Sequence, residues 1–211
     1  MNRRTHWDEV YRAKSAVSVS WYRPHLELSL ELIERYAGSL QAAILDIGGG
    51  ASTLADDLLG AGFEDVTVLD LAEGALAVSQ ERLGEVARSV RWIAADFLQA
   101  EVEEQRYDIC HDRAVFHFLG SAEERERYMD RVRRMLRPGG VLVLATFALD
   151  GPERCSGLPV SRYDEAGLMQ VVGERFGLVE SRRQSHVTPS GQTQELMYFV
   201  LRRSTSTDRV G

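Results

Sequence analysis

Three successive glycines, Gly48 to Gly50, follow a short apolar segment that contains Asp46 and precede a segment with helical periodicity. Glycine permits a tight turn and lets the backbone approach a bound molecule closely. In an open α/β sheet, ligands bind beyond the carboxyl ends of the strands, where such turns lie. A glycine-rich turn can also serve chain reversal alone, so its meaning depends on the residues that accompany it.

Two further acidic residues each follow an apolar segment. Asp70 ends the second such segment, 20 residues after Gly50, where a carboxylate can accept hydrogen bonds from both hydroxyls of a ribose. Asp96 follows the third, where it can accept from an exocyclic amine, and Phe97 offers an apolar wall to an adenine ring. Any one of these acids alone would be interpreted as a helix cap or a solvated loop residue. Together with the glycine loop, they predict a site for an adenosine-containing molecule at one edge of a sheet.

The segments that would position these residues alternate between strand and helix. Apolar runs predict strands at residues 42–47, 66–70, 90–94, 107–111 and 141–147. Periodicity and caps predict helices at residues 25–37, 52–60, 72–83, 122–136 and 163–175, the second of them capped by Ser52, whereas residues 1–23 show no clean period. This alternation is typical of an α/β protein with a mostly parallel sheet covered by helices on both faces. The last two strands, at 178–181 and 195–202, lack an intervening helix and should form an antiparallel pair at one edge.

Composition limits the class of protein. Of 211 residues, 44% are hydrophobic and 27% charged, which suits one domain over residues 1–203 and a disordered tail at 204–211. No apolar run could span a membrane and the charged start does not resemble a signal peptide, so we expect a cytoplasmic protein. The two cysteines, Cys110 and Cys155, exclude a disulfide framework and a four-thiolate zinc site, and we expect no metal. A net charge of −7 disfavours nucleic acid as a partner.

Five motifs, taken together, resemble those of the class I S-adenosylmethionine-dependent methyltransferases. They are residues 44–50 (ILDIGGG), 68–70 (VLD), 95–97 (ADF), 107–117 (YDICHDRAVFH) and 136–140 (LRPGG). The resemblance is strong over residues 40–147 and follows the family's layout elsewhere. It implies a Rossmann-like sheet of seven strands in the order 3-2-1-4-5-7-6, with S-adenosylmethionine as cofactor and S-adenosylhomocysteine as product.

The resemblance also implies which residues bind the cofactor. In the family, the glycine loop and the acid that matches Asp46 surround the methionine part of the cofactor. Asp70 would take the ribose hydroxyls, Asp96 and Phe97 would meet the adenine, and the segment His111-Asp112-Arg113 would pass the sulfonium. The full set of cofactor-binding residues predicted in this way is Trp21, Asp46, Gly48, Gly50, Asp70, Leu71, Asp96, Phe97 and Asp112.

Two other functions compete with a methyltransferase. A nicotinamide-dependent dehydrogenase wants glycine at the sixth position of the loop, which is Thr53 here, and the acidic Asp46 suits a cationic sulfonium better than a pyrophosphate. A degenerate family member could hold the cofactor as a non-catalytic binding module. The intact acids and glycines argue against lost binding but do not establish turnover.

Methyl transfer needs alignment of the nucleophile, exclusion of water and, for some acceptors, removal of a proton. His117, just past the fourth predicted strand, is the predicted catalytic base; the alternative is a core histidine with a packing role. The N-terminal region 1–38 contains Trp21 and Tyr22, which either close over the cofactor as a lid or only cover the core as a strap.

We expect the methyl acceptor to be a small molecule, because the loops at residues 152–159 and 189–191 are too plain for a macromolecular docking site. The N-terminal aromatic motifs resemble an uncharacterised bacterial branch of the family that is distantly similar to protein-lysine and thiopurine methyltransferases. Protein lysine is therefore the alternative acceptor. The acceptor atom and the oligomeric state stay open.

Overall fold

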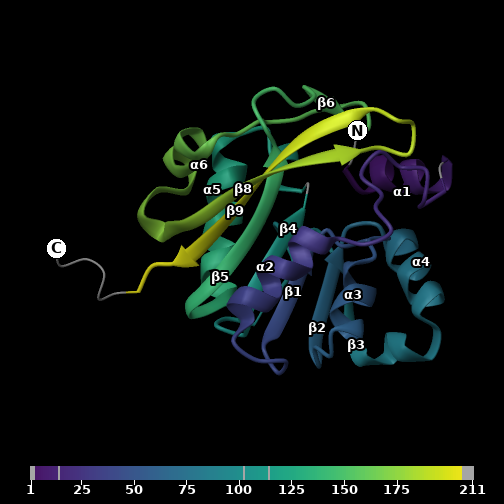
Figure 1. Cartoon of the computed structure of the whole chain (residues 1–211), viewed down its shortest axis with the longest axis horizontal. Coiled ribbons are helices and arrows are strands. Elements are labelled where there is room, and N and C mark those ends of the chain that lie inside the picture. The colour runs from purple at the N-terminus through teal and green to yellow at the C-terminus, as the bar shows by residue number, and fades with distance from the viewer. Residues whose placement is uncertain (1–2, 14, 102, 114, 206–211) are drawn as a thin grey trace.

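A seven-stranded sheet forms the centre of the computed structural model, which describes residues 3–13, 15–101, 103–113 and 115–205. The strands are β1 (Ala43–Ile47), β2 (Asp65–Asp70), β3 (Val90–Ala94), β4 (Tyr107–Arg113), β5 (Leu136–Phe147), β8 (Phe176–Val187) and β9 (Thr193–Arg203). They lie in the order β3-β2-β1-β4-β5-β9-β8, with β9 antiparallel to both neighbours and the other pairs parallel (Figure 1). The predicted fold class and strand order are confirmed.

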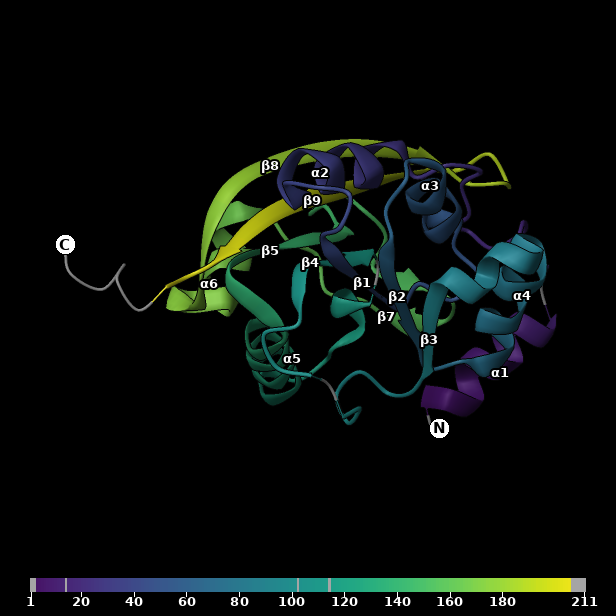
Figure 2. The same ribbon diagram turned by 90° about the horizontal axis from the view of Figure 1, so that it is seen from below.

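Helices cover both faces of the sheet. Successive residues of a strand point to opposite faces, so the apolar strands contribute to a core on each side. The helices α2 (Glu27–Ala37), α3 (Leu54–Gly60) and α4 (Glu73–Leu83) pack with Ile44, Val66 and Val143 in one apolar core. The helices α5 (Ala122–Met135) and α6 (Glu165–Val172) pack with Leu45 and Leu144 in another. Figure 2 shows α2 and α3 on one side of the sheet and α5 on the other.

Several boundaries differ from the expectation. Residues 3–13, where the sequence shows no clean period, form α1 (Arg3–Ala13), and none of its described residues is fully buried, so no apolar stripe marks it. The loop predicted at 152–159 contains a small hairpin of β6 (Arg154–Cys155) and β7 (Leu158–Pro159). Thr53 rather than Ser52 precedes α3, while Ser52 Oγ accepts a hydrogen bond from the Leu54 amide at 3.2 Å. Short 3-10 turns complete the fold: η1 (Gly84–Ser89), η2 (Phe116–Phe118) and η3 (Gly173–Arg175).

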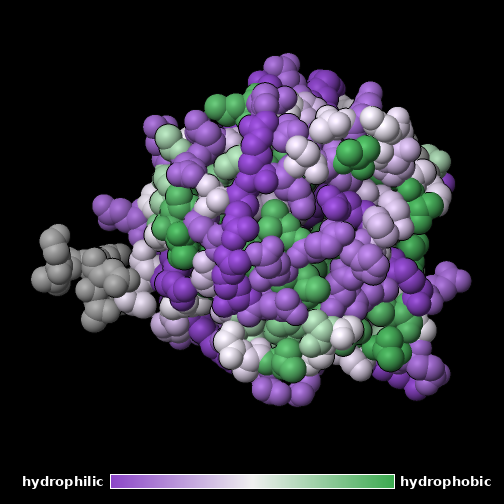
Figure 3. Space-filling view, in the orientation of Figure 1, coloured by the Kyte–Doolittle hydropathy of each residue, from purple (hydrophilic) through white to green (hydrophobic). Residues whose placement is uncertain are grey.

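The antiparallel pair of β8 and β9 is much longer than predicted. The outer strand β8 carries charged residues that form ion pairs across its surface, with Glu180 bound to Arg35 at 3.1 Å and Arg183 to Asp150 at 2.5 Å. Charges of this kind protect an edge strand from pairing with other chains. They also interrupt the apolar pattern by which a strand is recognised in a sequence, so most of β8 was not predicted as a strand. Figure 3 shows that the face in view is largely hydrophilic, with apolar residues in separate patches.

The end of β9 leads into the predicted tail. The amide of Ser204 donates to the Arg175 carbonyl at 3.0 Å, and residues 206–211 lie outside the described part of the chain. No helix among the described residues is long and apolar enough to cross a bilayer.

Candidate active site

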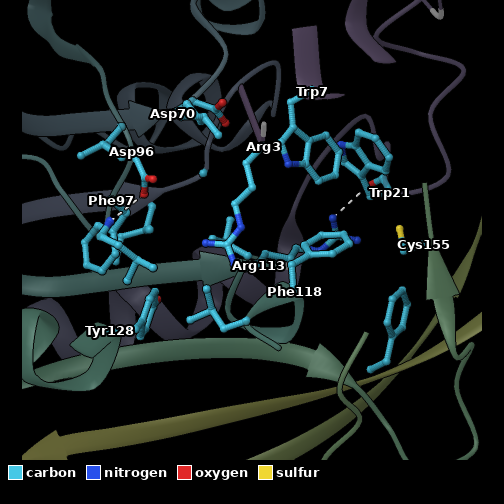
Figure 4. A pocket seen from close by; sticks show the side chains of 18 of the residues that line it. Arg3, Trp7, Trp21, Asp70, Asp96, Phe97, Arg113, Phe118, Tyr128 and Cys155 are labelled. Carbon is cyan, nitrogen blue, oxygen red and sulfur yellow. Dashed lines mark hydrogen bonds between the residues drawn. The ribbon is translucent and has the colours of Figure 1, made fainter. Parts of the chain in front are cut away.

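A pocket lies at the carboxyl ends of β1, β2, β3 and β4, which meet at one edge of the sheet. Among the residues predicted to bind the cofactor, those that line this pocket are Trp21, Gly48, Asp70, Leu71, Asp96 and Phe97. Figure 4 shows Asp70, Asp96 and Phe97 at one end, and Trp21, Phe118 and Cys155 at the other. The remaining predicted residues, all described, do not line the pocket: Asp46, Gly50, Asp112 and His117.

The glycine loop needs glycine for reasons of space and backbone conformation. Gly48 has φ of +73°, and a Cβ there would lie 2.0 Å from Cγ2 of Val115, which lines the pocket. Gly50 has φ of +43°, and a Cβ there would lie 2.8 Å from the Asp70 Oδ2. A side chain at either position would therefore displace the loop after β4 or the carboxylate at the end of β2.

Asp70 is a buried carboxyl with one oxygen already engaged. Its Oδ1 accepts a hydrogen bond from the Ala72 amide at 2.7 Å. Burial raises the pKa of Asp70 to about 7, and the negative charge of Asp46 adds to the rise, against the lowering effect of the backbone amides. Ribose hydroxyls that donate to this carboxylate would supply the solvation that burial removes.

Asp96 and Phe97 form the opposite wall of the same end. Asp96 Oδ1 accepts from the Leu98 amide at 2.9 Å and Oδ2 from Gln99 Nε2 at 3.1 Å, which fixes the carboxylate. The ring of Phe97 packs against Tyr128 at a centroid distance of 4.8 Å. A fixed acceptor beside an apolar ring fits an adenine, whose amine donates and whose faces are apolar.

Asp46 lies behind the glycine loop and belongs to a buried hydrogen-bond chain. His111 Nδ1 donates to Asp46 Oδ1 at 2.8 Å, and His111 Nε2 accepts from Ser29 Oγ at 3.0 Å, a tautomer assigned from these partners. Ser29 Oγ also lies 3.2 Å from the Tyr198 hydroxyl. The chain joins α2, β1, β4 and β9, and Asp46 also lies against the loop, since a Cβ at Gly49 would be 2.3 Å from Asp46 Oδ2.

Asp112 acts in a similar way on the segment after β4. Its carboxylate accepts from the amides of Val115 at 2.8 Å and Phe116 at 3.0 Å, and from the Tyr128 hydroxyl at 2.5 Å. Burial raises the pKa of Asp112 to about 6, against the lowering effect of these donors. Asp112 therefore holds the Val115 wall of the pocket, and its own side chain does not line the pocket.

The N-terminal segment covers the pocket with aromatic side chains. Trp7 of α1 lies edge-on to Trp21 at 5.9 Å and to Phe118 at 5.1 Å. Arg3 joins α1 to α5 through an ion pair with Glu124 at 2.6 Å. Trp21 also packs on the core of α2 and α3. Trp21 thus lines the pocket, as a lid would, and packs against the core, as a strap would.

His117 is fully buried and lies outside the pocket lining. Its ring stacks on Phe147 at 4.8 Å, and neither ring nitrogen has a hydrogen-bond partner within the described chain. Burial lowers the pKa of His117 to about 3, and the positive charge of Arg113 adds to the effect. This surrounding is that of the core histidine considered as the alternative to a catalytic base.

Several polar residues of the lining were not among the predicted site residues, and Arg113 and His186 are two of them. Arg113 ends β4, directly after Asp112 in the fourth motif, and its position within the predicted sulfonium segment is the signal that indicates it. His186 lies near the end of β8, in a stretch predicted as a long turn. Its Nε2 donates to the Ser20 carbonyl at 2.6 Å, whereas Nδ1 is buried without a partner among the described residues. Burial lowers the pKa of His186, so its imidazole is neutral near pH 7.

Comparisons with known proteins relate this chain to methyltransferases. A family model described as a methyltransferase domain matches residues 45–144. The EEF1A lysine methyltransferase 2 of Danio rerio is 26% identical over 155 residues, which cover 67% of this chain and 66% of that protein. The eEF1A lysine and N-terminal methyltransferase of Mus musculus is 24% identical over 141 residues, which cover 64% of this chain but only 20% of that protein.

Two solved structures share the fold across nearly the whole chain. One concerns the conversion of a disulfide bond into a thioacetal group during echinomycin biosynthesis; it has a TM-score of 0.76 and 22% identity, and the match covers 99% of this chain and 98% of the other. The second is the 1,6-didemethyltoxoflavin-N1-methyltransferase of Burkholderia thailandensis with bound S-adenosylhomocysteine. It has a TM-score of 0.69 and 23% identity, with 95% of this chain and 84% of the other covered. The chain thus matches a methyltransferase domain over residues 45–144, and over nearly its whole length it shares the fold of an S-adenosylhomocysteine-bound methyltransferase.

Proposed function

We propose that this protein transfers the methyl group of S-adenosylmethionine to a small organic acceptor held at the aromatic end of the pocket. The observation that carries the proposal is the continuity of one pocket from Asp70 and Asp96 to Trp21 and Phe118. The first end offers acceptors for the hydroxyls and amine of an adenosine. The second end is walled by rings and covered by α1, which suits a compact acceptor shielded from water.

The cofactor supplies an electrophilic methyl on a cationic sulfur, so the residues of this chain need to orient and protect more than to activate. Gly48 permits close approach of the loop backbone, and Val115, fixed by Asp112, forms the facing wall. Where an acceptor must lose a proton, His186 is the suitable base among the lining residues, because it is neutral and its Nδ1 has a free lone pair.

Protein lysine is the second candidate acceptor, and the similarity to EEF1A lysine methyltransferase 2 favours it. The charge of the pocket argues against it. The acids among the lining residues are Asp70 and Asp96, both at the adenosine end, whereas Arg113 lies beside Trp21. A lysine ammonium approaching the methyl would meet a guanidinium before it met a carboxylate.

Release of S-adenosylhomocysteine tests the proposal. The purified protein should bind S-adenosylhomocysteine in a calorimetric titration and should release it from S-adenosylmethionine when a small-molecule fraction of a cell extract is added. Binding without release in any extract fraction would instead support a non-catalytic cofactor-binding module. Absence of binding by a folded protein would refute the cofactor assignment.

A further inference from the structure

Arg113 lines the pocket, and one edge of its guanidinium makes no hydrogen bond within the described chain. Its Nη1 donates to the Trp21 carbonyl at 2.8 Å. Its Nε and Nη2 are buried and have no hydrogen-bond partner among the described residues. Within the described chain no carboxylate lies within ion-pair distance of this guanidinium, in contrast to Arg3, which lines the same pocket and is paired with Glu124.

A buried guanidinium without an anion is costly, because removal of a charge from water is compensated only by an opposite charge and by hydrogen bonds. Nε and Nη2 together form one edge of the planar guanidinium. Two parallel N–H groups on this edge match the two oxygens of a carboxylate, in the bidentate geometry that arginine favours. The unused edge therefore has the shape and charge of a carboxylate receptor.

The surroundings of Arg113 point to the acceptor side of the pocket. The guanidinium is hydrogen-bonded to Trp21, and Figure 4 shows this bond at the end of the pocket where Trp21 and Phe118 lie. His186 also lines the pocket, and its strand β8 is the edge of the sheet opposite to β3, which Asp96 follows. Phe147 and Phe118 supply apolar rings at this end.

We propose that the methyl acceptor is a planar, aromatic carboxylate and that Nε and Nη2 of Arg113 bind its carboxylate group. The proposal rests on the methyltransferase function proposed above and names the class of its substrate. The aromatic body would lie among Trp21, Phe118 and Phe147, and the carboxylate would neutralise the guanidinium. Arg113 thereby selects anionic acceptors and excludes cationic ones such as a lysine side chain.

S-adenosylmethionine also carries a carboxylate, so the test must distinguish the two sources. The first arm uses protein saturated with S-adenosylhomocysteine and matched probes that differ only in charge: 2-naphthoate with 2-naphthamide, and indole-3-acetate with indole-3-acetamide. Binding is measured by ligand-observed NMR. Each carboxylate should bind about tenfold or more tightly than its amide, the range for hydrogen bonds to a charged group. Equal binding of acid and amide, or no binding of either acid, would overturn the proposal.

The second arm uses R113Q, with R113K as a variant that keeps the charge and loses the fork. R113Q should reduce carboxylate binding to the level of the amide, and R113K should restore part of it. R183Q removes an exposed arginine paired with Asp150 and serves as the matched control, with no change expected. Unchanged carboxylate binding by both Arg113 variants would overturn the proposal, and the comparison of acid with amide on the unmodified protein stands even where a variant fails to fold.

The third arm measures S-adenosylhomocysteine and 5′-methylthioadenosine, which lacks the amino-acid end, on unmodified protein and on R113Q. Both affinities should stay within about twofold, well under 1 kcal/mol. A loss confined to S-adenosylhomocysteine would assign Arg113 to the carboxylate of the cofactor and refute the acceptor site. If the unmodified protein binds neither nucleoside, the proposed function fails instead, and the acid and amide probes then test Arg113 on the cofactor-free protein.

Discussion

Replacement of Asp70 by asparagine should stabilise the ligand-free protein and weaken cofactor binding at the same time. The folded carboxyl has a pKa of about 7, whereas the ordinary value is 3.8. Between these two values the folded state binds a proton that the unfolded state has released. The free energy of unfolding therefore falls as pH rises from about 4 to about 7, and the full penalty remains above pH 7.

The size of the effect follows from the difference in pKa. A rise from 3.8 to about 7 corresponds to about 4 kcal/mol, at 1.36 kcal/mol per unit. D70N keeps an oxygen to accept the Ala72 amide and removes the titration. The difference in stability between D70N and the unmodified protein should be smallest near pH 4, grow through pH 5 to 7, and level off by pH 8.

Urea denaturation at pH 4.5, 6, 7 and 8, without ligand, measures this difference. D150N is the matched control, because the pKa of the exposed Asp150 is lowered by hydrogen bonding to Arg183, so that variant should gain no stability as pH rises. A D70N difference that is flat with pH would show that the carboxyl is not held in its neutral form by burial, and would refute the reasoning.

D70N also tests the ribose site through the affinity for S-adenosylhomocysteine. An ionised Asp70 that accepts two hydroxyl donors is worth about 1.5–3 kcal/mol, or about 10- to 150-fold in affinity for S-adenosylhomocysteine. Because the ligand favours the charged carboxyl, binding to the unmodified protein should tighten as pH rises through 7, and binding to D70N should not. A D70N protein that binds normally would place the ribose elsewhere.

Three further outcomes follow from the same geometry. H117Q should keep methyl transfer within about threefold across pH 5.5–8, because a group with a pKa of about 3 is already neutral there; a loss of about 10² or more would restore it as the base. H186Q should lower kcat by about 10²–10⁴ for an acceptor that must lose a proton, without changing the Kd of S-adenosylhomocysteine, and an unchanged kcat would show that His186 is not the base. G48A should lower thermal stability and abolish S-adenosylhomocysteine binding, since its Cβ would lie 2.0 Å from Val115 Cγ2, whereas G74A, with open space around it in α4, should do neither.

The sequence is sufficient to predict the sheet and to bring Gly48, Asp70 and Asp96 to one pocket. Strands β1 to β5 contain apolar runs. Asp70 ends β2, and Gly48 and Asp96 follow β1 and β3, so topology alone brings these residues to one edge. The roles of Asp46 and Asp112 were less accessible. Both lie beside the pocket, but the direction of each side chain depends on partners from distant segments, Ser29 with His111 for one and Tyr128 for the other.

The acceptor end of the pocket could not be predicted in the same way. It is assembled from α1, which has no buried stripe, and from the far end of β8, whose charged surface hides its strand character. His186 reaches the pocket only because β8 continues beyond residue 181. Arg113 lies within a motif that the sequence identifies, but only the hydrogen bonds of the folded chain show that Nε and Nη2 of its guanidinium have no partner.

Methyl transfer to a small acceptor is tested most directly by incubating the protein with methyl-labelled S-adenosylmethionine and a cell extract. Small molecules, proteins and nucleic acids are then separated. The label should enter the small-molecule fraction, depend on the protein, and disappear with D70N at a limiting donor concentration. Label in the protein fraction, recovered on lysine, would contradict the account.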